Sequence, residues 1–308
     1  MRQAVRMTVN PADAVEIIRL WPDGPPTLIE GVPPEEEFQV PTGVAANTTF
    51  LRNISDPTLT VFAPQGPGNG LGIIVVPGGG WTVSAWTHEG LDVTRWLTAL
   101  GYTAFLLKYR VRASAPDLQA FAAEQAALDA GLAAGLAARM LPSAISDLIG
   151  PGSALEPTYL EARAACADDG RRAIEIVREQ AERFGLQAGV IGMIGFSAGA
   201  FLIVDVALDP RAKQVAFIAP IYGGETRGAP VPIDAPPLFT AVAQDDLLVR
   251  IVEGVHADWS AANRSSELHS FARGAHGFGM VKQGMPSDHW TDLFLAWLDD
   301  LGLASWSA

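Results

Sequence analysis

Ser197 lies in the pattern glycine, any residue, serine, any residue, glycine, which residues 195–199 form. Apolar residues precede the pattern directly (VIGMIGF) and follow it directly (AGAFLIVDVAL), which predicts a strand that turns sharply into a helix. The flanking glycines permit such a turn, and the turn holds the serine in a strained, exposed conformation. A serine placed in this way can act as a nucleophile if a base and an acid lie beside it.

Among the five histidines, His276 is the candidate base. It lies in the glycine-rich segment GAHGFG, directly after the last predicted strand. His269 falls within that strand, His256 falls in the middle of a predicted helix, and His289 begins the last helix. We therefore expect His276 to accept the proton of the serine, because a histidine titrates near neutral pH.

Two adjacent aspartates are candidates for the acid that orients this histidine. Asp245 and Asp246 follow the apolar segment LFTAVA, which predicts a strand. The usual pattern of such a loop is an acid, two further residues and a valine, and this pattern favours Asp246. Asp245 stays the alternative, and we otherwise expect it to stabilise or cap the loop.

Three glycines follow the apolar segment LGIIVV, at residues 78–80. Ester hydrolysis passes through a tetrahedral oxyanion, which backbone N–H groups can stabilise. Because glycines have no side chain, a substrate oxygen can approach the amides of Gly79 and Gly80. The amide of Ala198, which follows the serine, is expected to complete this oxyanion hole.

Four rings lie on segments that are expected to border the same cleft: Trp81, Trp86, His88 and Tyr222. Rings at a cleft can stack on a sugar, so we take these four as candidates for substrate binding. Ordinary packing is the alternative for each of them.

The segments that would position these residues alternate between two patterns. Short apolar segments predict strands at residues 58–62, 71–76, 103–108, 190–195, 215–219, 238–243 and 267–271. Apolar residues at helical spacing predict helices after residue 89 and at 172–184, 198–208, about 249–263 and 288–301. This alternation predicts an α/β fold with one mainly parallel sheet and helices on both faces.

We expect residues 1–308 to form a single domain, with a proline-rich N-terminal arm at residues 1–44. An alanine-rich insertion at residues 114–160 interrupts the alternation. Its larger apolar residues recur at helical spacing, from Leu118 and Phe121 to Met140. The insertion is therefore either an additional core helix or a lid over the site.

Charge and cysteine content exclude several classes of function. The chain of 308 residues has 34 acidic and 21 basic residues and a net charge of −13, which argues against a nucleic-acid or anionic-membrane partner. A single cysteine, Cys166, cannot form an internal disulfide, and no histidine and aspartate cluster has metal-ligand spacing. We expect no metal, no cofactor and no membrane span. The first ten residues do not resemble a secretory signal, so we expect a cytoplasmic protein.

With these motifs the chain resembles the α/β-hydrolase superfamily and, within it, the bacterial acetylxylan or carbohydrate esterases. The resemblance rests on PTLTVFAPQ, VVPGGGW with HEG, LLKYR, IGFSAGAFL and ELHSFARGAHGFGM. Pro77 departs from many lipase-like relatives, which have a histidine before the glycines. Glu89 and Gly90, within HEG, belong to the resemblance and are expected to have a structural role.

The resemblance implies a carboxylesterase with a triad of Ser197, Asp246 and His276 and an acyl-enzyme on the serine. The expected substrate, and the expected partner, is a small-molecule ester. Its acyl group is short, such as acetate, and its alcohol is neutral, with sugars among the candidates. One alternative is an acyl-peptide or amide hydrolase, and another is a non-catalytic binding protein on a hydrolase scaffold. Whether the chain forms a homo-oligomer stays open.

Overall fold

The computed structural model describes residues 16–40, 45–137, 141–149, 156–187, 190–212 and 215–303. Parts of the predicted arm (1–15 and 41–44) and of the predicted insertion (138–140 and 150–155) lie outside the described residues.

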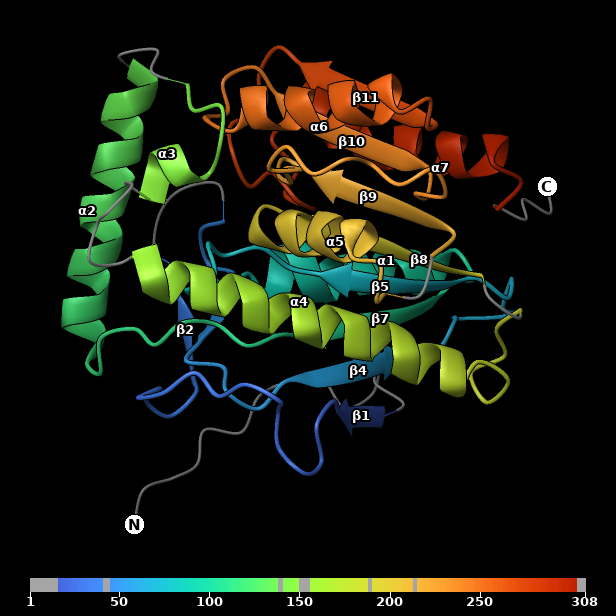
Figure 1. Cartoon of the computed structure of the whole chain (residues 1–308), viewed down its shortest axis with the longest axis horizontal. Helices are drawn as coiled ribbons and strands as arrows, with labels where there is room; N and C mark the ends of the chain where they lie inside the picture. Colours follow the sequence, from blue (N-terminus) through green and yellow to red (C-terminus); the bar gives the residue numbers. More distant parts are fainter. Residues whose placement is uncertain are drawn as a thin grey trace.

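A mainly parallel sheet forms the centre of the fold (Figure 1). Its order is β1-β4-β7-β5-β8-β9-β10-β11, and β5 and β7 to β11 run parallel while β4 runs antiparallel to both of its neighbours. The bounds are β1 Glu16–Arg19, β4 Thr58–Phe62, β5 Gly72–Val76, β7 Thr103–Lys108, β8 Ile191–Phe196, β9 Phe217–Ile221, β10 Leu238–Ala243 and β11 Ser266–Phe271. The prediction of one mainly parallel sheet is therefore confirmed.

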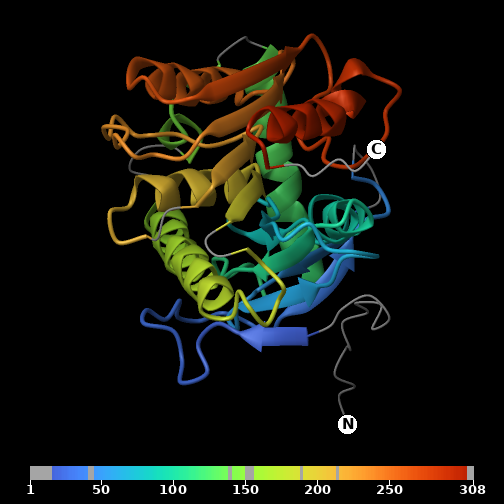
Figure 2. The same ribbon diagram turned by 90° about the vertical axis from the view of Figure 1, so that its right-hand side faces the viewer.

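Helices cover both faces of this sheet, as predicted. Figure 2 shows α4, α5 and α6 on one face and α1 and α7 on the other. Their bounds are α1 Asp92–Ala99, α4 Glu156–Glu179, α5 Ala198–Leu208, α6 Val249–Ala261 and α7 Trp290–Asp300. Short helical turns precede α1 and α7, namely η1 Thr87–Leu91 and η2 Pro286–His289.

The helix α4 begins sixteen residues earlier than the apolar spacing predicts. Its first half buries small side chains, among them Ala162, Ala165 and Cys166, which give little hydrophobic periodicity. Small residues permit close packing on α5: a Cβ atom at Gly170 would lie 2.6 Å from Leu202 Cδ2. The second half of α4, with its larger apolar residues, is the part that the sequence predicts.

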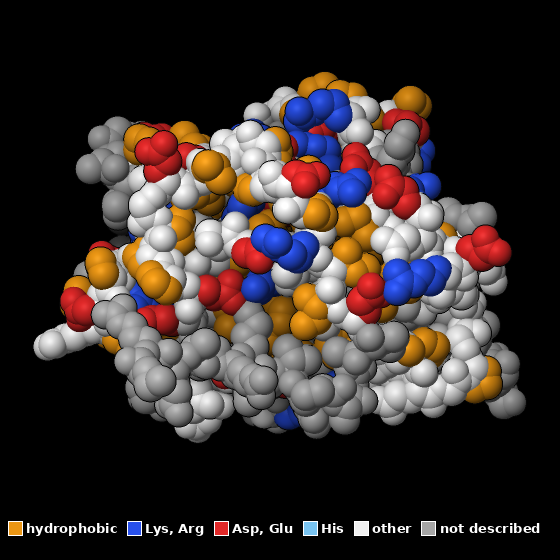
Figure 3. All heavy atoms as spheres, turned by 90° about the horizontal axis from the view of Figure 1, so that it is seen from below, with side chains coloured by type: hydrophobic (Ala, Val, Ile, Leu, Met, Phe, Trp, Pro, Cys, Tyr) orange, Lys and Arg blue, Asp and Glu red, His pale blue; other side chains and the backbone are white. Residues whose placement is uncertain are grey.

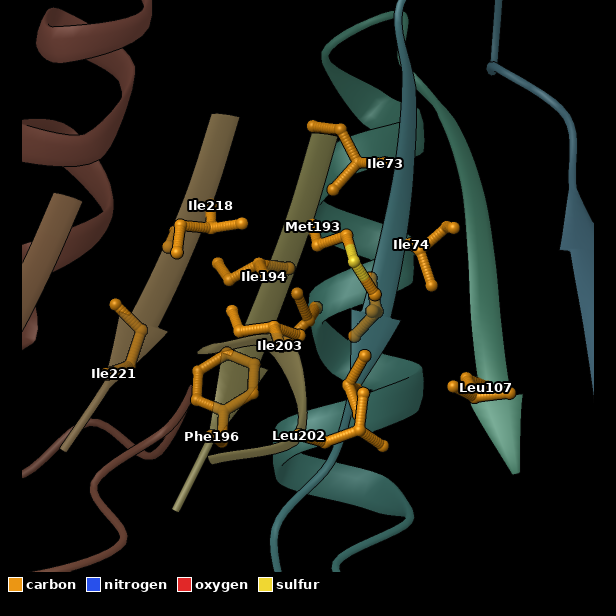
Figure 4. Packing of buried hydrophobic residues seen from close by; sticks show 14 of the residues in the cluster. Ile73, Ile74, Leu107, Met193, Ile194, Phe196, Leu202, Ile203, Ile218 and Ile221 are labelled. Carbon is orange, nitrogen blue, oxygen red and sulfur yellow. The ribbon is translucent and has the colours of Figure 1, made fainter. Parts of the chain in front are cut away.

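The strands that carry the site are held together by a continuous apolar core. Side chains of β8 pack between those of β5 and β9, and those of α5 cover them (Figure 4). Since both faces of these strands are covered by helices, they are apolar throughout rather than alternating. The core residues that Figure 4 labels are Ile73, Ile74, Leu107, Met193, Ile194, Phe196, Leu202, Ile203, Ile218 and Ile221.

Two helices of the predicted insertion lie at one end of the sheet. They are α2 Leu118–Ala137 and α3 Ser146–Ile149, and β9 points toward them in Figure 1. Phe121 of α2 is buried against Phe38 of β2 (Glu36–Gln39), with ring centroids 5.2 Å apart, while Leu118 is half exposed. The strand β2 belongs to a small antiparallel sheet with β3 (Thr49–Arg52) and β6 (Val83–Ser84).

No helix within the described ranges has both the length and the apolar character that crossing a membrane requires.

On the face in Figure 3, Lys and Arg side chains lie interspersed with Asp and Glu.

The ion pair between Arg110 and Asp169 is buried and joins three segments. Arg110, just after β7, donates to Asp169 of α4 over 2.8 Å, and neither side chain is more than 1% exposed. Trp21, after β1, donates its Nε1 proton to the same carboxylate over 2.8 Å. Removing one partner of such a pair leaves a charge buried and uncompensated.

We therefore expect Asp169→Ala to lower the free energy of unfolding by about 3–5 kcal/mol. Asp56→Ala is the matched control, because its pair with Arg19 is more than half exposed and such pairs contribute less than about 1 kcal/mol. Urea unfolding of both variants measures the difference. Equal losses would contradict the importance of the buried pair.

Candidate functional site

Ser197 stands in a strained turn between β8 and α5. Its φ of 47° and ψ of −117° are unusual for a residue with a side chain. The neighbouring glycines permit this turn, because a Cβ atom at Gly195 would lie 2.4 Å from the carbonyl oxygen of Gly199, and one at Gly199 would lie 2.1 Å from that of Val76. The Ser197 amide donates to the carbonyl oxygen of Ile221 over 3.0 Å, which ties the turn to β9.

The structure brings the three predicted triad residues into one chain of hydrogen bonds. Ser197 Oγ lies 2.8 Å from His276 Nε2, and His276 Nδ1 lies 2.8 Å from Asp246 Oδ2. Asp246 is 1% exposed, and its other oxygen accepts the Leu248 amide proton over 2.8 Å. With a proton on Nδ1 donated to the aspartate, Nε2 is free to accept the serine proton.

Asp245 holds the loop that carries the histidine. Its Oδ1 atom accepts the amide protons of Gly274 and Ala275 over 3.0 and 2.9 Å. The structure thus places Asp246, and not Asp245, beside the imidazole of His276, while Asp245 stabilises the loop by binding its backbone amides.

The environment of His276 favours its charged form. Partial burial lowers the pKa of the imidazole, but the charge and hydrogen bond of Asp246, together with the charge of Glu89, raise it more. The pKa of His276 is therefore raised above its ordinary value. Its side chain remains 40% exposed, so solvent and a ligand can reach it.

The glycine loop after β5 lies against the serine. A Cβ atom at Gly78 would lie 2.8 Å from Ser197 Cβ, and one at Gly79 would lie 2.1 Å from the carbonyl oxygen of Val83. Gly79 and Gly80 have φ angles of 129° and 59°, which favour glycine. The Val83 amide donates to the Gly79 carbonyl oxygen over 3.0 Å and so closes a tight turn.

The four rings proposed to bind substrate are buried, which leaves little of their surface exposed to a ligand. Trp81, Trp86 and His88 are 3–4% exposed, and Tyr222 is fully buried. Trp81 packs on Phe201, with ring centroids 5.3 Å apart. The ring of Tyr222 packs on His276, with centroids 5.2 Å apart, so it supports the imidazole rather than offering a stacking surface.

Two residues beside the glycine loop were not among the predicted site residues. Glu89 accepts the amide proton of Gly78, and Tyr109 donates to the carbonyl oxygen of Pro77. The signal in the sequence that points to Glu89 is that residues 81–91, which follow the glycines, contain no other Asp, Glu, Lys or Arg.

No group of three histidine, cysteine, aspartate or glutamate residues in the described ranges could hold a metal ion.

A cavity of about 720 Å³ lies between α4, α5 and residues 226–229, and no triad residue lines it. Its arginines are paired with carboxylates, as in Arg171–Asp209, which are 2.7 Å apart.

No family model matches the chain. Over 65 residues it is 37% identical to an acetylxylan esterase of Xylanibacter ruminicola, and the match covers 20% of this chain and 13% of that protein. The chain therefore spans only a small part of the length of this curated relative.

Solved structures match over most of the chain. An acetyl ester-xyloside bifunctional hydrolase of Caldicellulosiruptor lactoaceticus superposes with a TM-score of 0.61 at 20% identity, covering 94% of this chain and 97% of that one. An α/β hydrolase from a deep-sea metagenome library of the Medee basin gives 0.56 at 20% identity, with 80% and 92% covered. A carboxylesterase of Lactobacillus plantarum gives 0.56 at 16% identity, with 88% and 99% covered. The chain has the α/β-hydrolase fold.

Proposed function

We propose that the chain is a serine-dependent carboxylic ester hydrolase. The observation that carries this proposal is the chain of hydrogen bonds from Ser197 through His276 to Asp246, with both contacts at 2.8 Å. These residues come from three separate loops at the carboxyl ends of the strands, where active sites of open α/β sheets lie. Esterases among the structural neighbours support the proposal.

In the first step Ser197 Oγ attacks the ester carbonyl carbon, and its proton moves to His276 Nε2. The carbonyl oxygen becomes an oxyanion, which the amides of Gly79, Gly80 and Ala198 stabilise. Collapse of this intermediate breaks the bond to the alcohol, and the alcohol leaves with the proton from His276. The product is an acyl-enzyme on the serine.

In the second step water replaces the alcohol. His276 accepts a proton from the water, whose oxygen attacks the acyl carbon and forms a second oxyanion. The serine then leaves with the proton from the imidazolium, and the free acid departs. Asp246 keeps its charge throughout and stabilises the imidazolium in both steps.

The substrate that we propose is an ester of a short acyl group, such as acetate, with a neutral alcohol such as a sugar. The names of an acetylxylan esterase and an acetyl ester-xyloside hydrolase among the matches support the acetyl group and the sugar. The net charge of −13 supports a neutral ester over an anionic one.

Ser197→Ala tests the nucleophile. We expect kcat/KM for p-nitrophenyl acetate to fall by at least about 10⁴-fold, because no other group can form the acyl-enzyme. Ser260→Ala, on α6, is the control and should retain activity. A fluorophosphonate should label Ser197 in the unmodified protein. Unchanged turnover in Ser197→Ala would exclude Ser197 as the nucleophile, and no labelling would argue for a binding protein.

The dependence of kcat/KM on pH tests the base. Only neutral His276 can accept the serine proton, so activity is expected to rise with pH around the pKa of His276. Since that pKa is raised, the midpoint should lie above about 6.5, the value for free histidine. Asp246→Asn removes the charge that raises the pKa and should move the midpoint to lower pH. A midpoint that does not respond to this substitution would exclude the assignment.

Gly79→Ala tests the glycine loop. The new Cβ atom would overlap the carbonyl oxygen of Val83, so the loop must change shape. We expect kcat to fall by about 10²–10³-fold, the typical effect of losing one oxyanion donor. Gly185→Ala is a matched control, because Gly185 also has a positive φ, of 67°, but a Cβ atom there would meet open space. Comparable losses in both variants would show that strain, and not the oxyanion hole, is responsible.

A further inference from the structure

We propose that Glu89 and Tyr109 are positioning residues that clamp one peptide plane of the glycine loop, the plane between Pro77 and Gly78. By holding this plane they aim the amides that follow it at the oxyanion. The proposal rests on the proposed function, since an oxyanion forms only if Ser197 attacks an ester.

Both polar groups of this peptide plane are held by side chains. The carbonyl oxygen of Pro77 accepts from the Tyr109 hydroxyl over 2.7 Å, and the amide of Gly78 donates to Glu89 Oε2 over 2.7 Å. In a trans peptide the C=O and N–H groups point in opposite directions, so the two side chains grip opposite edges of the plane. A rotation of the plane would lengthen both hydrogen bonds at once.

The clamped plane lies directly against the reacting atoms. A Cβ atom at Gly78 would lie 2.7 Å from Glu89 Oε2 and 2.8 Å from Ser197 Cβ. The next amide along the chain is that of Gly79, a predicted oxyanion donor. Such donors are effective because they are fixed before the charge develops, so a tilt of the preceding plane weakens them.

The same carboxylate reaches the loop of the base. Glu89 Oε1 accepts from the Tyr222 hydroxyl over 2.7 Å, and that hydroxyl accepts the Gly279 amide proton over 3.0 Å. Gly279 follows His276 by three residues, and its carbonyl oxygen accepts from Trp290 Nε1 over 2.7 Å. Glu89 therefore joins the glycine loop to the loop that carries His276.

Burial makes these contacts strong. Glu89 is 3% exposed, and a buried carboxylate is costly unless hydrogen bonds compensate for lost water. Among the described residues, Tyr222 lies 2.7 Å from it and the Nε2 atom of His88 lies 3.7 Å from Oε1, and the charge of Glu89 also contributes to raising the pKa of Tyr109. The charge of Glu89 also raises the pKa of His276, which the charge of Asp246 raises further.

Kinetics of Glu89→Gln and Tyr109→Phe test the clamp. We expect kcat and kcat/KM for p-nitrophenyl acetate to fall together by about 10- to 100-fold in each variant, because the donors act in the transition state. Glu89→Gln should also move the midpoint of the pH profile to lower pH, since it removes a charge that raises the pKa of His276. Tyr109→Phe, which removes no charge, should leave the midpoint in place. The double variant should lose less than the two single losses combined, because both residues hold one plane.

Tyr102→Phe is the matched control, because Tyr102 and Tyr109 flank opposite ends of β7 and both are buried. It should leave kcat unchanged. Thermal unfolding of every variant identifies a loss of activity that comes from unfolding alone.

Hydrogen exchange tests the clamp without any substrate. In Glu89→Ala the Gly78 amide loses its acceptor, and its exchange should become about tenfold faster or more, while the amides of β8 stay protected. If Glu89→Ala does not fold, Tyr109→Phe serves for the same measurement, because it releases the opposite edge of the same peptide plane.

The two proposals fail in different ways. If the unmodified protein hydrolyses no ester and Ser197 resists a fluorophosphonate, the proposed function is wrong, and the exchange rate of Gly78 alone decides whether the clamp exists. If the protein hydrolyses esters but Glu89→Gln and Tyr109→Phe keep their kcat, the clamp has no role in positioning the oxyanion loop.

Discussion

The site depends on the close approach of three stretches of backbone around one serine. The end of β5, the turn after β8 and the segment after β9 come so near that a Cβ atom at Gly199 would lie 2.1 Å from the carbonyl oxygen of Val76, and one at Gly223 would lie 2.5 Å from that of Ser197. A side chain at either glycine would push the strand ends apart. Because the proposed oxyanion donors and the proposed nucleophile lie on these stretches, their spacing is set by contact between backbones rather than by flexible side chains.

The sequence predicted the elements whose apolar pattern is continuous. β4, β10 and α5 begin and end where the pattern places them, because their residues are buried almost throughout. It failed for the first half of α4, where alanines and a glycine pack closely without a hydrophobic period. It also left open how the insertion at residues 114–160 functions, which depends on contacts between segments far apart in the chain.

For the site, the order and context of Ser197, Asp246 and His276 were sufficient to predict residues that the structure brings together. Aromatic residues near these motifs were poorer guides, because their place in the sequence does not say which way a ring faces. For Glu89 the sequence indicates a structural role but not the contacts that the residue makes. Its neighbours in space, Gly78 and Tyr222, lie 11 and 133 residues away, so a local pattern carries little information about its contacts.

The two adjacent aspartates after β10 make different contacts. Asp246 holds the imidazole ring and Asp245 holds the loop from which that ring projects. The loop that carries His276 is thus bound to the end of β10 through both aspartates. Ser197 is anchored two strands away, on β8. A change in the spacing between β8 and β10 would therefore alter the distance between Ser197 and His276 more than the distance between His276 and Asp246.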